Sequence, residues 1–220
     1  LPAISKEQKK DKKFLLIVVA ASCLVAAMFG SRNSLSLTIE GIDQSQTLNY
    51  LQISFAFALG QLVVGAISPF AGMIADKYGS GKTLTVGILL GLLGIILIPY
   101  STTAFTLSIS LGVISSIGLG VAGLPVVLAS VNRLIPQNKV GMAFGLVNAG
   151  QSLGQLILAP LAGFIIVNFG WILCILFLCT VLLLVLPFSF TLRSTTSDLE
   201  FSPIIFVQLV LLLNSLSPVI

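Results

Sequence analysis

Four polar residues that stand inside long apolar stretches of this chain could hold a small anionic ligand. Arg32 offers a planar fork of N–H donors that suits a carboxylate. Asn148, Gln151 and Gln155 follow one another at steps of three and four, so a helix would carry them on one face. The alternatives are an arginine that extends outward to water and amides that hydrogen-bond a neighbouring helix. The first interpretation predicts a ligand site built from Arg32 and the three amides.

A second group of residues forms the compact motif G-M-I-A-D-K-Y-G-S-G-K, which begins at Gly72 and ends at Lys82. Its glycines, among them Gly79, permit a tight turn between two helices. We expect Asp76 to accept backbone amides at a helix amino terminus, while Lys77 and Lys82 tie this carboxylate to a neighbouring segment. An ordinary charged turn is the alternative. The spacing favours a gating motif made of Gly72, Asp76, Lys77, Gly79 and Lys82.

The composition places these groups in a membrane protein. The chain of 220 residues is 56% apolar and only 8% charged, whereas soluble domains average about 25% charged residues. It has no histidine, and its three cysteines lie in apolar runs without metal-site spacing. The sequence shows no nucleophile–base pair either. We therefore expect no enzyme activity, no cofactor, no metal site and no nucleic-acid partner.

Six apolar segments are long enough to cross a bilayer, which takes about 20 helical residues. A basic tail at residues 1–13 precedes a membrane domain at 14–192, and a linker with a partial seventh apolar segment follows at 193–220. The predicted spans are 14–38, 48–74, 83–100, 104–132, 140–167 and 171–190.

The cations predict how these spans are oriented. Ten of the 11 lysines and arginines fall on one side of a six-span arrangement, and the loops on the other side have none. Cytoplasmic loops are the ones enriched in such residues, so the amino terminus is predicted to be cytoplasmic, in the cell membrane. The ten are Lys6, Lys9, Lys10, Lys12, Lys13, Lys77, Lys82, Arg133, Lys139 and Arg193.

An internal repeat divides the six spans into two units. Residues 69–79 read P-F-A-G-M-I-A-D-K-Y-G, and residues 160–170 read P-L-A-G-F-I-I-V-N-F-G. The first copy ends the second span on the cytoplasmic side, and the second copy ends the fifth span outside. The predicted fold is therefore all-α, a six-helix membrane bundle of two inverted three-helix repeats.

Small residues predict where the helices of this bundle approach one another closely. The first two glycines of the third span, Gly87 and Gly91, are one turn apart. In the fifth span we expect a packing ridge of Gly141, Gly145 and Ala149, with Gly150 and Gly154 beside it.

The motif from Gly72 to Lys82 resembles the signature loop of the major facilitator superfamily, although Ser80 and Gly81 stand where that family usually has basic residues. Three further segments resemble its bacterial monocarboxylate and oxalate/formate branch. They are residues 30–34 (G-S-R-N-S), residues 118–125 (G-L-G-V-A-G-L-P), and the pattern from Gly141 through Gly154-Gln155 and Pro160 to Gly170-Trp171. The resemblance covers residues 14–193.

This resemblance implies twelve helices in two halves, of which this chain has the first, with substrate bound between the halves. It implies a secondary transporter for small organic anions that works by alternating access within membrane lipid. Arg32 would hold the substrate carboxylate, and Asp76 and Lys77 would stabilise one gate state. Exchange is favoured over proton coupling because the predicted spans contain no Asp or Glu. The alternatives are a six-helix remnant that transports nothing, and a half-transporter that pairs with a second half or with its own copy.

Overall fold

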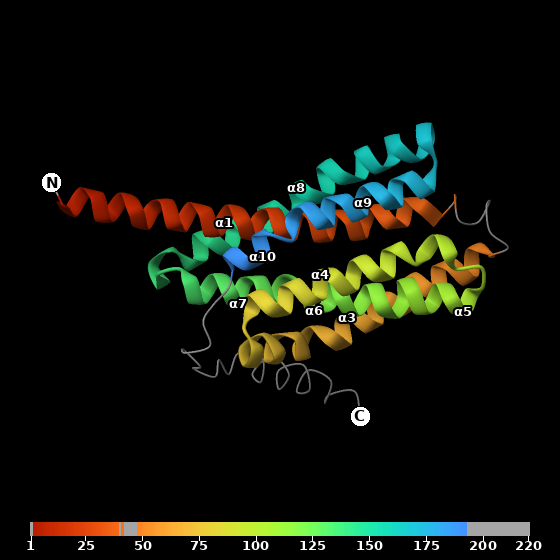
Figure 1. The fold of residues 1–220 in the computed structure, drawn as a ribbon, viewed down its shortest axis with the longest axis horizontal. Coiled ribbons are helices and arrows are strands. Elements are labelled where there is room, and N and C mark those ends of the chain that lie inside the picture. The colour runs from red at the N-terminus through yellow and green to blue at the C-terminus, as the bar shows by residue number, and fades with distance from the viewer. Residues whose placement is uncertain (1, 40, 42–47, 193–220) are drawn as a thin grey trace, which may run out of the picture.

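The computed structural model is a bundle of helices that run side by side along its long axis (Figure 1). It describes residues 2–39, 41 and 48–192, and no strand occurs among them. The helices are α1 (Pro2–Leu35), η1 (Ser36–Thr38), α3 (Tyr50–Tyr78), α4 (Ser80–Ile96), η2 (Ile98–Tyr100), α5 (Ala104–Leu107), the π-helix η3 (Ser108–Ser115), α6 (Ser116–Val121), α7 (Leu124–Leu134), α8 (Gln137–Phe169), α9 (Trp171–Val185) and α10 (Phe188–Thr191).

Six segments of the described chain are helical, long and apolar enough to cross a membrane, which confirms the predicted number. Residues 2–13, expected as a separate tail, continue α1 as a helix that projects beyond the bundle (Figure 1). The predicted linker at 193–220 lies outside the described residues. The observed spans are Phe14–Thr38, Tyr50–Tyr78, Ser80–Tyr100, Ala104–Leu134, Gln137–Phe169 and Trp171–Thr191.

Two glycines make the shortest turns of the bundle. The predicted gap between the second span, which was expected to end at residue 74, and the third, which was expected to begin at residue 83, is wrong, because α3 continues to Tyr78 and α4 begins at Ser80. Gly79 alone reverses the chain with a φ of 92°, and Gly170 does the same between α8 and α9 with a φ of 87°. Side chains strongly disfavour such positive φ values, so glycine is required at both turns.

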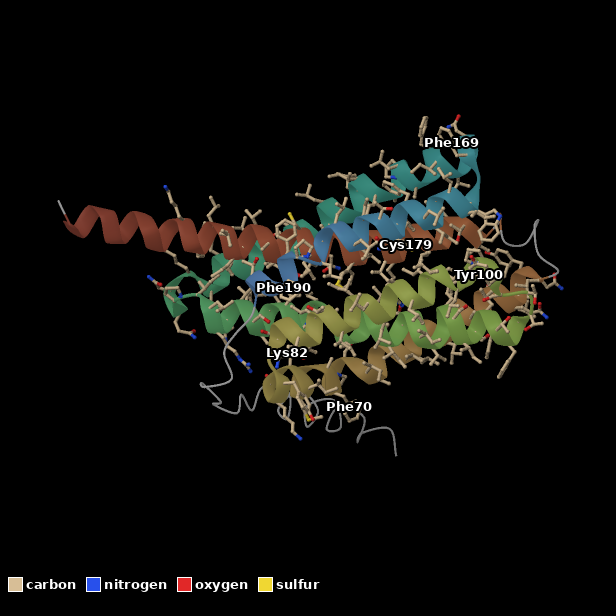
Figure 2. The ribbon with its side chains drawn as sticks, in the orientation of Figure 1. Phe70, Lys82, Tyr100, Phe169, Cys179 and Phe190 are labelled. Atoms are coloured by element: carbon tan, nitrogen blue, oxygen red, sulfur yellow. The ribbon has the colours of Figure 1, made fainter. Side chains whose placement is uncertain are left out.

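These two turns occupy equivalent places in the sequence repeat and opposite ends of the bundle. Pro69 lies inside α3 and Pro160 inside α8, each followed ten residues later by the turn glycine. Figure 2 shows Lys82, close to the first turn, and Phe169, next to the second, toward opposite ends of the helix bundle. This arrangement confirms that the two three-helix units are inverted relative to each other.

The first and fourth spans form the centre of the bundle. In their most apolar windows 56% and 67% of the residues are buried, against 17% in α3 and in α8. Along its length α1 packs on α8, while η3 and α6 pack on α3 and α4. The apolar outer faces of α3 and α8 suit contact with lipid.

Glycines set the closest helix approaches, but only some of those predicted. A Cβ on Gly154 would lie 2.2 Å from the carbonyl oxygen of Ala26, and one on Gly150 would lie 2.7 Å from the Cβ of Ser22. By contrast, Gly141 and Gly145 face open space. The predicted ridge of Gly141, Gly145 and Ala149 is therefore wrong, because the neighbouring face of α8 is the one turned toward α1.

The third span packs closely against a neighbouring helix where its glycines predict. A Cβ on Gly87 would lie 2.7 Å from Ala122, and Gly91 lies against Leu119 of α6. Both glycines are buried. This close packing holds α4 against the central fourth span.

Candidate functional site

A cavity of about 320 Å³ opens between the first, second and fourth spans. Its size falls in the range of small-molecule sites. Polar groups and apolar side chains both line it, so it can receive a ligand with a charged end and an apolar body. The lining residues that carry the argument are Arg32, Phe57, Gln61, Leu111, Ser115 and Ser116.

Arg32 lies on this cavity, and its part in binding a ligand stays a prediction. Its Nη2 atom donates a hydrogen bond to Oε1 of Gln61 at 2.7 Å. Gln61 is neutral, and the described residues that line the cavity include no Asp or Glu and no second cation. Within the described part of the chain, the cavity therefore carries one positive charge that no lining residue neutralises.

The fourth span reaches this cavity through a π-helical segment, η3. The hydroxyl of Ser116 donates to the carbonyl oxygen of Leu111, five residues earlier, at 3.0 Å. This wider turn brings Leu111, Ser115 and Ser116 to the cavity together. π-helical turns are rare and occur frequently at functional sites.

The three amides of the fifth span do not reach this cavity. No residue of α8 lines it. The side-chain amide of Asn148 donates to the carbonyl oxygen of Phe144 in its own helix at 2.9 Å, and Gln151 and Gln155 are partly buried. The structure thus brings Arg32 together with Gln61 rather than with Asn148, Gln151 or Gln155, whose part in a ligand site stays a prediction.

The gating motif contains an ion pair between two spans. Asp76 lies in the last turn of α3 and pairs with Arg133 in the last turn of α7. Asp76 does not itself begin a helix, because α3 continues through this residue to Tyr78, and its contact with amides at the amino terminus of another helix stays a prediction. Lys77 Nζ lies 5.4 Å from the ring centroid of Tyr78, and Lys82 is exposed. The partner of the carboxylate is therefore Arg133, and not one of the motif's own lysines.

Two further contacts join helices in this part of the bundle. Lys139 Nζ lies 5.3 Å from the ring centroid of Phe14, which joins the start of α8 to α1. The hydroxyl of Ser80 donates to the carbonyl oxygen of Leu192 at 2.8 Å, which joins α4 to the end of the sixth span. Lys77, Lys82, Arg133 and Lys139, which were predicted to share one side of the membrane, thus lie at or near the ends of α3, α4, α7 and α8.

Sequence reasoning missed two residues that the structure brings into these sites. Gln61 carried a signal, because it is a polar residue inside an apolar span, and such residues are often functional. Arg133 was used only to predict the orientation of the spans, although its loop and the loop of Asp76 were predicted to face the same side of the membrane. Among residues 2–39, 41 and 48–192, no cluster of His, Cys, Asp and Glu could hold a metal ion.

Comparisons with known proteins identify relatives of this chain. A family model described as Major Facilitator Superfamily matches residues 18–212. The riboflavin transporter RibZ of Clostridioides difficile is 28% identical over 162 residues, which are 74% of this chain and 35% of that protein. Monocarboxylate transporter 11 of Mus musculus is 25% identical, over 81% of this chain and 39% of its own length. Monocarboxylate transporter 2 of Homo sapiens is 27% identical, over 71% of this chain and 32% of its own length. The chain matches roughly a third of the length of these relatives.

Proposed function

Because the chain belongs to the Major Facilitator Superfamily, we propose that it acts in secondary transport of small organic anions such as monocarboxylates. Arg32 carries this proposal, since it is the one charged residue among the described residues that line the cavity, and its hydrogen-bond partner there is neutral. The monocarboxylate transporters among its relatives support the same substrate class.

The cost of placing an arginine inside a span explains why an anion would bind there. Insertion scales put this cost at about 2.5–3.5 kcal/mol for a charged residue at the centre of a membrane helix. A hydrogen bond from Arg32 to Gln61 satisfies one N–H group of the guanidinium but leaves the charge in place. A carboxylate would neutralise this charge and match the geometry of the guanidinium. Among the described lining residues, a bound anion therefore balances the charge of Arg32.

The second element of the proposal is a gate at the ion pair between Asp76 and Arg133. The Asp76–Arg133 pair joins the ends of α3 and α7, and both side chains are partly exposed. Exposed ion pairs contribute only about 0–1 kcal/mol, so thermal motion can open this one in every transport cycle. Lys77 and Lys82 add positive charge beside it. We place this end of the bundle, and with it the amino terminus, in the cytoplasm.

The substitution Arg32→Ala tests the binding role. Uptake of radiolabelled L-lactate into proteoliposomes should fall to the level of empty vesicles, while the amount of folded protein stays normal. Arg32→Lys keeps the charge without the two-point contact and should retain part of the uptake. Lys12→Ala, which removes an exposed cation away from the cavity, serves as the control.

Two results would count against the proposal. Normal lactate uptake by Arg32→Ala would remove Arg32 from the site. A wild-type protein that transports none of a panel of lactate, pyruvate, formate and oxalate would refute the anion class. Riboflavin belongs in the same assay, because one relative bears that name and Phe57 gives the cavity an aromatic wall on which a flavin could stack.

The molecular mass of the complex in detergent would test the two alternatives from the sequence. The family resemblance implies transporters built from two six-helix halves. We therefore expect this chain to work with a second half, either a separate chain or its own copy. A stable dimer that transports lactate supports pairing with itself. A monomer without transport supports a six-helix remnant.

A further inference from the structure

One face of the third span is an exposed apolar stripe with a lysine at one end and a tyrosine at the other. Its members follow one another at alternating steps of four and three residues, so they share one side of the helix. The four apolar members are between 46% and 53% exposed, and Tyr100 is 77% exposed. Figure 2 shows Lys82 and Tyr100 toward the two ends of this span. This α4 stripe consists of Lys82, Val86, Leu89, Leu93, Ile96 and Tyr100.

The α4 stripe has the length and the composition of a surface that faces lipid. A helix rises about 1.5 Å per residue, so Lys82 and Tyr100 lie about 27 Å apart along it. The hydrocarbon layer of a membrane is about 30 Å thick, and lysine and tyrosine anchor helices at its two surfaces. Contacts between membrane helices are enriched in small residues, whereas every apolar member of this stripe is large. The stripe therefore suits acyl chains better than a second helix.

A second lysine stands close to Lys82 across a turn of one residue. Gly79 reverses the chain between α3 and α4, with Lys77 two residues before it and Lys82 three residues after it. Both lysines are exposed, and Lys77 Nζ lies 5.4 Å from the ring centroid of Tyr78. This end of α3 also exposes three apolar side chains, Phe70, Met73 and Ile74.

The charge of these two lysines is not neutralised within the described part of the chain. Asp76, the acid next to Lys77 in the sequence, pairs with Arg133, and neither lysine forms an ion pair with a described residue. Each ammonium offers three N–H donors at the end of a long, flexible side chain. The turn thus presents two cations at the edge of an apolar surface. Clusters of cations in this position are typical of binding to anionic lipid headgroups.

We propose that the turn at Gly79 binds an anionic phospholipid. The phosphate accepts hydrogen bonds from the ammonium groups of Lys77 and Lys82, and an acyl chain lies along the α4 stripe. Phosphatidylcholine and phosphatidylethanolamine carry a cation of their own beside the phosphate, and the two lysines repel it. Phosphatidylglycerol has no such cation, so its net charge complements the turn. Selectivity then comes from repulsion of the zwitterionic lipids as well as from attraction of the anionic one.

A tryptophan reporter beside the two lysines tests this proposal. The chain has one tryptophan, so Trp171→Phe gives a background that lacks tryptophan fluorescence. Tyr78→Trp then places a reporter at the turn and keeps an aromatic ring beside Lys77, while Tyr100→Trp places a matched reporter at the other end of the α4 stripe. Brominated lipids quench tryptophan on contact. Quenching of the full chain in vesicles that contain brominated phosphatidylglycerol or brominated phosphatidylcholine gives the relative affinity of each position for the two lipids.

The reporter at position 78 should prefer phosphatidylglycerol by at least about tenfold, because each lysine near a membrane surface favours anionic lipid by about fivefold. The reporter at position 100 should show a ratio close to one. Replacing both lysines, with Lys77→Gln and Lys82→Gln, should bring the ratio at position 78 to within about twofold of one. Lys12→Gln removes an exposed lysine from a different helix and should leave the ratio unchanged.

A second measurement needs no tryptophan substitution. The wild-type chain is purified in detergent from vesicles with equal amounts of the two lipids, and the lipid that stays bound is identified by mass spectrometry. Wild type should retain mainly phosphatidylglycerol, and the chain with both lysines replaced should not.

Three results would overturn the proposal. The first is equal affinity for the two lipids at position 78, or a preference that survives the loss of both lysines. The second is no quenching at position 78 by either lipid, which would show that protein covers the turn. The third is a preference that inorganic phosphate abolishes while chloride at the same ionic strength does not, since the ligand would then be free phosphate. The assay contains no transport substrate, so its outcome is independent of the proposed function.

Discussion

The close contact of α1 with α8 predicts that one added methyl group will destabilise the bundle. Gly154 faces the backbone of α1, where a Cβ would lie 2.2 Å from the carbonyl oxygen and 2.4 Å from the Cα of Ala26. Contacts of Cβ atoms below 3.0 Å are essentially absent from proteins, so Gly154→Ala forces the two helices at least ~0.8 Å apart. The obstructing atoms are backbone, and therefore no side chain can rotate away.

The size of this effect follows from two opposing terms. Overpacking a well-filled interior costs typically about 1–3 kcal/mol. Alanine in place of glycine in a helix recovers up to about 1 kcal/mol of helix propensity. Gly145, nine residues earlier in α8, has open space at its Cβ position. Gly145→Ala therefore gains helix propensity without the cost of overpacking. The free energies of unfolding of the two variants should differ by about 1–3 kcal/mol, nearer the upper value because the clash is with backbone.

Thermal unfolding in detergent, followed by circular dichroism, measures this difference. In a chain of 150–250 residues, about 1 kcal/mol corresponds to roughly 2–4 °C in Tm. We expect Gly154→Ala to unfold about 4–12 °C below Gly145→Ala. Similar Tm values for the two variants would refute the reasoning, because the face of α8 that packs on α1 would then be wrongly assigned.

Two further predictions concern the gate and the orientation. Asp76→Asn removes the charge that pairs with Arg133, far from the cavity along α3, so the maximal rate of lactate uptake should fall severalfold while KM changes little. Initial rates over a range of lactate concentrations measure this, and a rise in KM alone would contradict a gating role. Single cysteines introduced at Lys82 or Lys139 in a cysteine-free background should stay unlabelled by an impermeant maleimide in intact cells, whereas one at the exposed Thr102 should react. Labelling at Lys82 from outside would reverse the proposed topology.

The number and approximate positions of the spans were predictable from the sequence because each depends on a local run of residues. A helix crosses the bilayer where about 20 apolar residues follow one another, whatever lies beside it. The turns were predicted less well. At Gly79 the chain reverses within one residue, and the polar residues around it, which suggested a loop, are helical.

The candidate site was predictable only in part. Arg32 was identified because a cation inside an apolar run is costly and therefore conspicuous. Its partner Gln61 is 29 residues away, and Arg133 is 57 residues from Asp76. No spacing within one segment relates such pairs, because they meet only when separate helices pack.

The sequence by itself determined that this chain is a membrane bundle of six helices in two inverted units, since apolar length, charge and the repeat are written along it. Only the tertiary structure decided which face of each helix turns inward. In a soluble helix the apolar face marks the interior, but lipid is as apolar as the core of this bundle. Apolar residues therefore occur both on the buried side of α8, as at Val147 and Leu158, and on its exposed side, as at Leu146 and Leu153. Packing alone selected Gly154 over Gly145 as the contact, and placed Gln61 rather than Asn148 beside Arg32.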